Sequence, residues 1–537
     1  MRWWGWGEDS GAISLPEPAL AMLREELGLD GSHTGSRVQL DEVQVPAPAL
    51  PDSVRRDLAT VGVSDDHAGR VSHAVGRSYP DLVRIRSGDG STAPDAVVTP
   101  ASAGQVPEIL AACARAGVAV IPFGGGTSVV GGVEALRGPH GAAVSLDLTG
   151  LDALLHVDPG SLTATVEAGV FGPALETLLG EHGMTLGHFP QSFEYSTVGG
   201  WVATRSAGQA STGYGRIDEL VESVRCETPT GTLETLDVPA SAAGPSLREL
   251  VVGSEGVLGV ITQATLRVRP LPEARHYEAW SFRSFEEGAE AYRVLEQSGA
   301  SPDVARLSDE HETRLSMALA SSGSTAERAG REYLRLRGHE HGCIAFTGFD
   351  GTPDEVARRR GRTAGILRAH GALSLGQKPG RSWLKGRFAA PYLRDEMLDH
   401  GVMVETLETA TTWSNLHRLY AAVGGALRES LQARGTPPTV MCHISHLYPS
   451  GASLYFTFIA RQEPGAELEQ WRAAKNAACD AIVANGGTIT HHHAVGADHA
   501  PWMTDEIGEL GVAVLAAAKE RLDPAGIMNP GKLLPGT

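Results

Sequence analysis

Cysteine is scarce in this 537-residue chain, and its spacing fits neither a disulfide framework nor a zinc site. The cysteines number five, are far apart and form no Cys-x-x-Cys pair: Cys113, Cys226, Cys343, Cys442 and Cys479. Disulfide scaffolds and cysteine metal sites need paired or regular spacing. We therefore expect a reduced protein whose thiols are buried and structural.

Basic residues are in the minority, with 45 Lys and Arg against 64 Asp and Glu and a formal net charge of −19. Such a surface disfavours a nucleic-acid partner and a general attraction to anionic lipid. No segment has the apolar length of a membrane span, and the first residues lack the apolar core of a secretory signal. The final Leu-Pro-Gly-Thr is not a peroxisomal address. We expect a cytoplasmic protein and leave open peripheral membrane contact and a homodimer.

Glycine, in contrast, is concentrated in one stretch that runs from Ile121 to Glu134. Apolar residues at positions 106, 109, 110 and 113 predict a helix before it, which Gly117 ends, followed by a buried strand over 118–121. A strand that leads into Gly-Gly-Gly can bring several backbone N–H groups close to a phosphate. A plain glycine-rich turn is the alternative interpretation, because such motifs are weak on their own.

Two further stretches of small and hydroxyl residues, 187–208 and 253–262, lie in the same alternating strand-and-helix region. Three such loops in one domain suit a long dinucleotide laid across loop tips. We expect an N-terminal wrapping segment (1–90), a cofactor domain (91–272), an α+β cap that shapes a substrate cavity (273–480) and a C-terminal segment that returns to the cofactor (481–537). The cap is marked by strand patterns at 343–348 and 451–460.

The glycine-rich motifs resemble those of the vanillyl-alcohol oxidase-type FAD superfamily, over about residues 91–537. They are Pro-Phe-Gly-Gly-Gly-Thr-Ser (122–128), Ser-Thr-Val-Gly-Gly-Trp-Val-Ala-Thr-Arg (196–205), Gly-Ser-Glu-Gly-Val-Leu-Gly-Val-Ile-Thr (253–262) and Asp-Pro-Ala-Gly-Ile-Met-Asn-Pro-Gly-Lys (523–532). Within the superfamily, four features resemble the alkyldihydroxyacetonephosphate synthase family. They are Arg-Trp-Trp-Gly-Trp-Gly (2–7), Ser-Phe-Glu-Tyr-Ser-Thr (192–197), Gly-Ala-Ser-Leu-Tyr-Phe (451–456) and His-His-His-Ala-Val-Gly (491–496). The related D-2-hydroxyacid dehydrogenases usually carry Glu-His-Gly-Ile-Gly where this chain has three histidines.

The resemblance implies an α+β fold, with a two-subdomain FAD-binding domain and an α+β cap. It implies non-covalent FAD, since 121–134 holds no histidine for a covalent link. The implied FAD-binding residues are Pro122, Phe123, Gly124, Gly125, Gly126, Thr127 and Ser128; Gln191, Ser192, Phe193, Glu194, Tyr195, Ser196 and Thr197; Thr204, Arg205, Ser206 and Ala207; and Glu255, Gly256, Val257, Leu258, Gly259, Val260 and Ile261.

The family's reaction replaces the acyl group of an acyl-dihydroxyacetone phosphate with a long-chain alcohol, which makes an ether lipid precursor. In that picture a proton leaves the carbon that bears the ester, flavin N5 bonds to this carbon as the fatty acid departs, and the alcohol displaces N5. An FAD-dependent D-2-hydroxyacid dehydrogenase or oxidase is the alternative function, and a silent protein that keeps FAD structurally is a third. Chain-length preference is left open.

Tyr455 falls at the family's catalytic tyrosine, although an ordinary core tyrosine on an alternating strand would look the same. A phenol with an ordinary pKa near 10 needs a cationic or histidine neighbour to act as a base. His491, His492 and His493 are candidates; on a strand, the first and third would share one face. A metal site is the rival interpretation, with His499 as the one further ligand nearby, and we expect none.

Two arginines match family positions: Arg394 would bind the substrate phosphate, and Arg306 is a second active-site arginine. Guanidinium groups suit phosphate, but most arginines lie on solvated faces or in salt bridges. Where the family has basic residues, this chain has His443 before the Tyr455 strand, and Asp498 and His499 after the histidines. These changes leave the exact substrate open.

Overall fold

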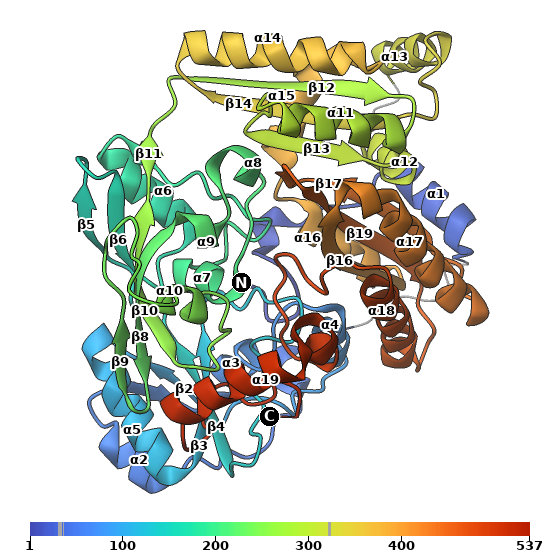
Figure 1. Ribbon diagram of the computed structural model, residues 1–537. Coiled ribbons are helices and arrows are strands. Elements are labelled where there is room, and N and C mark those ends of the chain that lie inside the picture. The colour runs from blue at the N-terminus through green and yellow to red at the C-terminus, as the bar shows by residue number, and fades with distance from the viewer. Residues whose placement is uncertain (30–34, 36, 321–323, 537) are drawn as a thin grey trace.

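The computed structural model describes residues 1–29, 35, 37–320 and 324–536 (Figure 1). Its N-terminal half contains two main sheets, and its C-terminal half is built on one large sheet. Helices and strands alternate through both halves, so the expected α+β class is confirmed. All five cysteines are free and buried, as the sequence predicts.

The first sheet has the strand order β1-β2-β4-β3, in which β2, β4 and β3 are parallel. Its strands are β1 (Gly62–Ser64), β2 (Ala96–Thr99), β3 (Val118–Phe123) and β4 (Ala142–Asp147). Helix α5 (Val106–Ala116) precedes β3 and buries the apolar face that the sequence predicts. It ends at Gly117, whose φ of 62° lies in the left-handed region that favours glycine. β3 then delivers the chain into the glycine-rich loop.

The second sheet is antiparallel, with the order β5-β6-β10-β8-β9. Its strands are β5 (Leu154–Asp158), β6 (Thr163–Glu167), β8 (Val221–Thr228), β9 (Gly231–Glu234) and β10 (Val260–Arg267). Five helices accompany it: α6 (Gly172–Glu181), α7 (Val198–Thr204), α8 (Ser211–Tyr214), α9 (Ile217–Leu220) and α10 (Leu247–Val251). A short pair, β7 (Met184–Thr185) with β11 (Arg269–Pro270), leads into the cap.

The cap sheet has the order β15-β12-β14-β13-β17-β19-β16, and β18 pairs with β19. Its strands are β12 (Ala274–Phe282), β13 (Val304–Ser308), β14 (Cys343–Gly351), β15 (Leu373–Gly376), β16 (Val402–Thr412), β17 (Thr439–Ile444), β18 (Leu447–Tyr448) and β19 (Gly451–Arg461). The largest buried apolar cluster packs one face of this sheet against four helices: α11 (Phe285–Gln297), α14 (Pro353–Ala369), α17 (Leu416–Ala433) and α18 (Glu467–Ala484). The remaining cap helices are α12 (Glu310–Leu319), α13 (Thr325–Leu336), α15 (Gln377–Gly386) and α16 (Ala390–Asp399). On the opposite face, α1 (Glu17–Leu27), α12 and α16 pack against part of β16, β17 and β19.

The two ends of the chain connect the halves. The N-terminal helices are α1 (Glu17–Leu27), α2 (Asp52–Asp57), α3 (His67–Ser72) and α4 (Tyr79–Arg86). Trp6 is buried, and its backbone N–H donates to Asp395 of α16 at 2.5 Å. The last helix, α19 (Met503–Leu522), lies back over the two-sheet half (Figure 1). Within the described ranges, no helix has both the length and the apolar character needed to cross a membrane.

Candidate active site

A cavity of about 830 Å³ lies between the glycine-rich loop and the face of the cap sheet opposite α11, α14, α17 and α18. Its wall includes the loop after β3, the start of α7, and side chains of β16, β17 and β19. Trp6 also lines it, so the N-terminal segment completes the wall. We call this space the central cavity. Its volume lies within the usual range of ligand and cofactor pockets.

The glycines of the loop after β3 are required by close backbone packing. A Cβ on Gly125 would lie 1.6 Å from the carbonyl oxygen of Tyr195, and one on Gly124 would lie 2.3 Å from Thr197 Oγ1. Gly126 has a φ of 65°, which a side chain rarely tolerates. Two of the predicted FAD-binding segments therefore touch each other through backbone atoms, and only glycine fits between them.

Most of the predicted FAD-binding residues line the central cavity together. They are Pro122, Phe123, Gly124, Gly125, Gly126, Thr127, Ser128, Gln191, Ser192, Ser196, Thr197, Thr204, Ser206, Ala207, Glu255, Gly256, Gly259 and Ile261. Glycine amides beside hydroxyl groups form an environment that suits the pyrophosphate of a dinucleotide. The donor set therefore fits FAD.

The other predicted FAD-binding residues lie behind this surface. Phe193, Val257, Leu258 and Val260 pack into apolar clusters, and Glu194 is exposed. The Tyr195 hydroxyl contacts Tyr392, and Arg205 reaches outward to Val252 O, Asp218 and Glu249. These side chains hold the loops in place and do not line the cavity.

Glu255 joins the cofactor loops to the C-terminal segment. Its buried carboxyl group accepts the backbone N–H of Val495 at 2.7 Å and of Gly496 at 2.6 Å. Burial raises the pKa of Glu255 to about 7, although these two hydrogen bonds act in the opposite direction. Repulsion between this group and a dinucleotide phosphate is reduced accordingly.

At the cap side of the cavity, Tyr455 lies between two strands that carry titratable side chains. In the antiparallel register it faces His443 of β17 and Glu408 of β16. The His443 ring stacks on Tyr455 with the centroids 4.6 Å apart, and the rings of His493 and His492 lie at 5.3 and 6.0 Å. Burial raises the pKa of Tyr455 to about 12, so its hydroxyl is protonated at neutral pH.

The histidine tract is not a strand, so the condition under which His491 and His493 would share one face is not met. The chain is irregular here, and three successive backbone N–H groups converge on the Glu408 carboxylate, at 2.7, 2.8 and 2.8 Å from His491, His492 and His493. A strand would point alternate N–H groups to opposite sides. The buried carboxylate replaces strand pairing as the partner of these amides. As a result His492 and His493 line the cavity, while His491 turns to Tyr448.

Glu408 is the anion of this cluster. Burial on its own would raise the pKa of Glu408, but the three histidines and the N–H donors lower it well below its ordinary value. Burial lowers the pKa of His492, takes that of His491 well below its ordinary value and brings that of His493 to about 3, so these imidazoles are neutral at pH 7. A neutral imidazole beside a phenol can exchange a proton with it.

Both predicted arginines line the same cavity but differ in their partners. Arg306 pairs with Glu312 at 2.6 Å and contacts the His443 ring at 3.1 Å. Burial opposes ionisation of Glu312, but His443 and Arg306 bring its pKa down to about 2, so the charge of Arg306 is compensated. Arg394 donates to the carbonyl oxygen of Arg77 at 2.6 Å and pairs with Asp395 at 3.4 Å. Its Nε is buried and has no hydrogen-bond partner within the described ranges, which leaves donor capacity toward a ligand.

Sequence reasoning missed Glu408, Glu312 and His446. Glu408 lies in β16, which also contains the buried Glu405 and several threonines, so its residue type did not single it out. His499 and Asp498 lie away from the cavity wall: His499 is buried and contacts Ala494 O.

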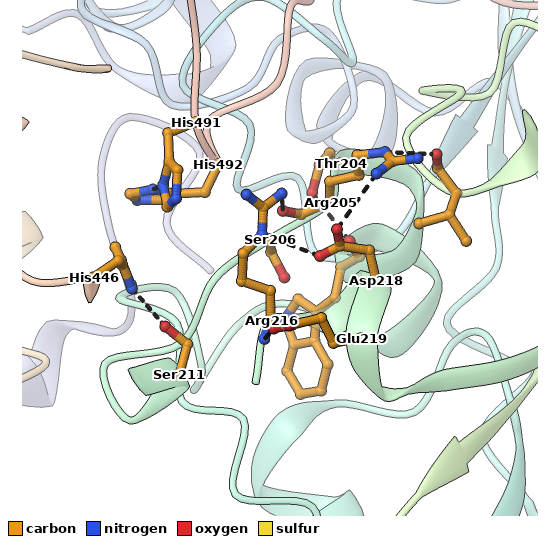
Figure 2. A network of polar contacts seen from close by, with 12 residues as sticks. Thr204, Arg205, Ser206, Ser211, Arg216, Asp218, Glu219, His446, His491 and His492 are labelled. Carbon is orange, nitrogen blue, oxygen red and sulfur yellow. Dashed lines mark hydrogen bonds and ion pairs between the residues drawn. The ribbon is translucent and has the colours of Figure 1, made fainter. Parts of the chain in front are cut away.

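His446, His491 and His492 each offer a ring nitrogen within 4.8 Å of the others (Figure 2). Four of their six ring nitrogens already have partners: both nitrogens of His491 contact His492 and Tyr448, and Nδ1 of His446 contacts Ser211. Arg216 adds positive charge close by. We assign no metal to this group.

Comparisons with known proteins agree with this geometry. The profile "FAD binding domain" matches residues 94–237, and "FAD linked oxidases, C-terminal domain" matches residues 271–533. Alkyldihydroxyacetonephosphate synthase of Dictyostelium discoideum is 34% identical, covering 100% of this chain and 93% of the relative. The protein of the same name from Trypanosoma brucei brucei is 35% identical, covering 92% and 82%. A solved alkyldihydroxyacetonephosphate synthase structure matches with a TM-score of 0.86 at 32% identity, covering 99% of both chains.

These similarities extend over the whole chain, from the N-terminal tryptophans to the closing lysine motif. They confirm FAD as the cofactor, the FAD-binding fold and the family resemblance seen in the glycine-rich loops and the histidine tract. The chain belongs to the alkyldihydroxyacetonephosphate synthase family of FAD-dependent enzymes.

Proposed function

We propose that this enzyme exchanges the acyl group of an acyl-dihydroxyacetone phosphate for a long-chain alcohol. The observation that carries the proposal is the position of Tyr455, in a cavity that the FAD-binding loops also line and beside histidines held by Glu408. Bound flavin supplies an electron sink for the substrate carbon. Tyr455 and His492 remove a proton from that carbon and later return one to it. His493 completes the cavity wall. Arg394 binds the phosphate, and the ion-paired Arg306 fixes His443 against Tyr455.

The cavity wall also contains an apolar strip that suits an alkyl chain. Its members come from α12, α16, β16, β17 and β19: Leu315, Leu319, Met397, Val404, Met441 and Ile459. A small hydroxy acid would leave this surface uncovered, whereas a long hydrocarbon chain would bury it at about 0.8 kcal/mol per methylene group. The strip therefore supports a lipid substrate over a D-2-hydroxy acid.

The direct test is an anaerobic assay with purified yellow protein. Acyl-dihydroxyacetone phosphate and a labelled long-chain alcohol are supplied without any electron acceptor. Labelled ether, with the flavin oxidised after turnover, is the expected result. Absence of ether together with bleaching of the flavin by D-hydroxy acids would assign the dehydrogenase reaction. Absence of both would leave the protein as a silent FAD binder and overturn the proposal.

The lipid substrate would be collected at a membrane surface by a protein that works in the cytoplasm. Sedimentation with and without phospholipid vesicles tests this contact, and sedimentation equilibrium tests the proposed homodimer. Co-sedimentation with vesicles and twice the chain mass are the expected results.

Replacing Glu408 with glutamine is expected to lower ether formation by about 10- to 100-fold, as seen for groups that orient active-site side chains. The amide would place an NH₂ group against backbone N–H donors and would release His492 and His493 from their positions. Removing the charge of this buried group should also lower the free energy of unfolding by about 3 kcal/mol. Denaturant unfolding and the labelled-alcohol assay measure the two effects.

The matched control is Glu278→Gln. It removes the charge of a buried glutamate that pairs with the half-buried Arg360 at 2.9 Å, and this pair does not line the cavity. It should lower stability without lowering the rate per folded, flavin-loaded enzyme.

The pKa of Glu408 is lower in the folded state than in the unfolded state. The contribution of Glu408 to the free energy of unfolding is therefore complete above about pH 4.3 and is lost as the pH falls below that value. Full activity of Glu408→Gln would contradict the orienting role.

A further inference from the structure

A continuous chain of hydrogen bonds leads out of the central cavity through residues behind it. His492 lines the cavity, and its Nδ1 lies 2.9 Å from Nδ1 of His491. His491 does not line the cavity, and 3% of its side chain is exposed. Its Nε2 lies 2.6 Å from the hydroxyl of Tyr448. Every contact in this chain joins atoms that can both give and receive a proton.

The outer end of the chain reaches a hydrated rim. Tyr448 is half-buried, and the residues that follow it, Pro449 and Ser450, are exposed. Its hydroxyl interacts with Arg216, whose Nε contacts Asp218 at 3.0 Å (Figure 2). The Arg216 and Asp218 side chains are 17% and 18% exposed. Water can therefore reach the polar groups next to Tyr448.

We propose that His492, His491 and Tyr448 form a proton path between the substrate carbon and bulk water. This inference rests on the proposed function, which requires a proton to leave that carbon and one to return. His492, at the inner end of this hydrogen-bond chain, faces the reaction space beside Tyr455. Tyr448, at the outer end, faces the rim. Tyr448 is thus assigned a role in the reaction although it does not line the cavity.

The transfer conserves protons at each contact. His492 accepts the substrate proton at Nε2, directly or through Tyr455, while its Nδ1–H proton passes to His491 Nδ1. The Nε2–H proton of His491 passes to the Tyr448 oxygen, and the Tyr448 hydroxyl proton passes to water at the rim. Each of the two imidazoles has then changed to its other neutral tautomer. Because the product keeps two hydrogens on the same carbon, one proton must return, and the reverse transfer restores the starting tautomers.

The charges around the path favour transport over storage of the proton. Burial lowers the pKa of both His491 and His492, and Arg216 lowers them further, so neither imidazole holds the proton for long. The Glu408 carboxylate, 3.4 Å from His492 Nδ1 and 3.7 Å from His491 Nδ1, stabilises the transient positive charge. Asp218 offsets the charge of Arg216 at the outer end. His446 stands beside the path, and its Nδ1 contacts Ser211 at 2.5 Å.

The test is Tyr448→Phe in the FAD-loaded enzyme, which removes one oxygen from the path. Acyl-dihydroxyacetone phosphate is incubated in D₂O without alcohol, and deuterium on the ester-bearing carbon is followed by mass spectrometry. Exchange and ether formation should fall about tenfold or more, which is less than the 10²- to 10⁴-fold typical of an acid–base group that contacts the substrate. Flavin absorbance should be unchanged. Added imidazole, a small mobile proton carrier, should restore part of the exchange, which it would not do for a purely structural defect.

The matched control is Tyr420→Phe, which also removes one hydroxyl hydrogen bond, to Asp309 at 3.0 Å, but lies off the path. It should exchange at the wild-type rate. A second variant, His491→Gln, should show the same defect, and the double variant should be no slower than either single one, because both interrupt one path. Wild-type exchange in both path variants would overturn the path. Absence of exchange and ether in the wild type would overturn the proposed function itself.

Discussion

Replacing Gly125 with alanine is expected to yield a colourless protein that retains no FAD through purification. The added Cβ would lie 1.6 Å from the Tyr195 carbonyl oxygen, so the loop after β3 and the loop at 192–197 must separate. The second loop cannot easily move, because the N–H groups of Tyr195 and Ser196 both donate to Ser192 O at 2.9 Å. Since both loops line the cofactor cavity, a shift of about 1 Å should cost on the order of 100-fold in activity even in flavin-rich buffer.

The control is Gly180→Ala in α6, where an added Cβ meets nothing within 4 Å and alanine improves helix propensity. It should purify yellow with a thermal transition no lower than that of the wild type. Visible absorbance after gel filtration gives the flavin content, and circular dichroism shows whether Gly125→Ala is folded. A folded, fully yellow Gly125→Ala protein would contradict the argument that backbone contact between the loops forms the cofactor site.

The sequence was most informative where the backbone conformation depends on residues close by in the chain. Gly117 ends a helix in the left-handed region, and the triple glycine follows a buried strand, so both could be located from residue type and periodicity alone. The strand of Tyr455 alternates apolar and polar residues from Leu454 to Phe458, which is why β19 was also predictable. These features depend on neighbours within a few positions.

The geometry of the histidine tract could not be derived in this way. Its conformation is determined by Glu408, which lies more than 80 positions earlier and meets the tract only in the folded protein. The local pattern left the direction of each histidine side chain open, because it depends on a buried carboxylate that is distant in sequence. The pairing of Arg306 with Glu312 and His443 likewise depends on β13, α12 and β17 meeting in the cap. Such contacts are tertiary, so the residue types were predictable but not their partners.

Replacing Tyr455 with phenylalanine is expected to lower ether formation by about 1,000-fold with KM nearly unchanged. Only the hydroxyl oxygen is removed: the β16–β19–β17 pairing and the stacking of His443 at 4.6 Å suit a phenyl ring equally well. A positioned acid–base group typically contributes 10²- to 10⁴-fold. Because it acts in the transition state and not in binding, the loss should appear in kcat.

The raised pKa of Tyr455 determines how it can act. With a pKa of about 12 the phenol is neutral at pH 7 and must share its proton with a neighbour, which the neutral His492 can accept. Tyr277→Phe, which removes a hydroxyl contact with Asp350 in the same sheet but outside the cavity wall, is the matched control and should retain wild-type kcat. Steady-state rates with labelled alcohol measure both variants. Wild-type kcat in Tyr455→Phe would show that the histidines alone handle the proton. Loss of both D₂O exchange and kcat would identify Tyr455 as the group that first receives the substrate proton.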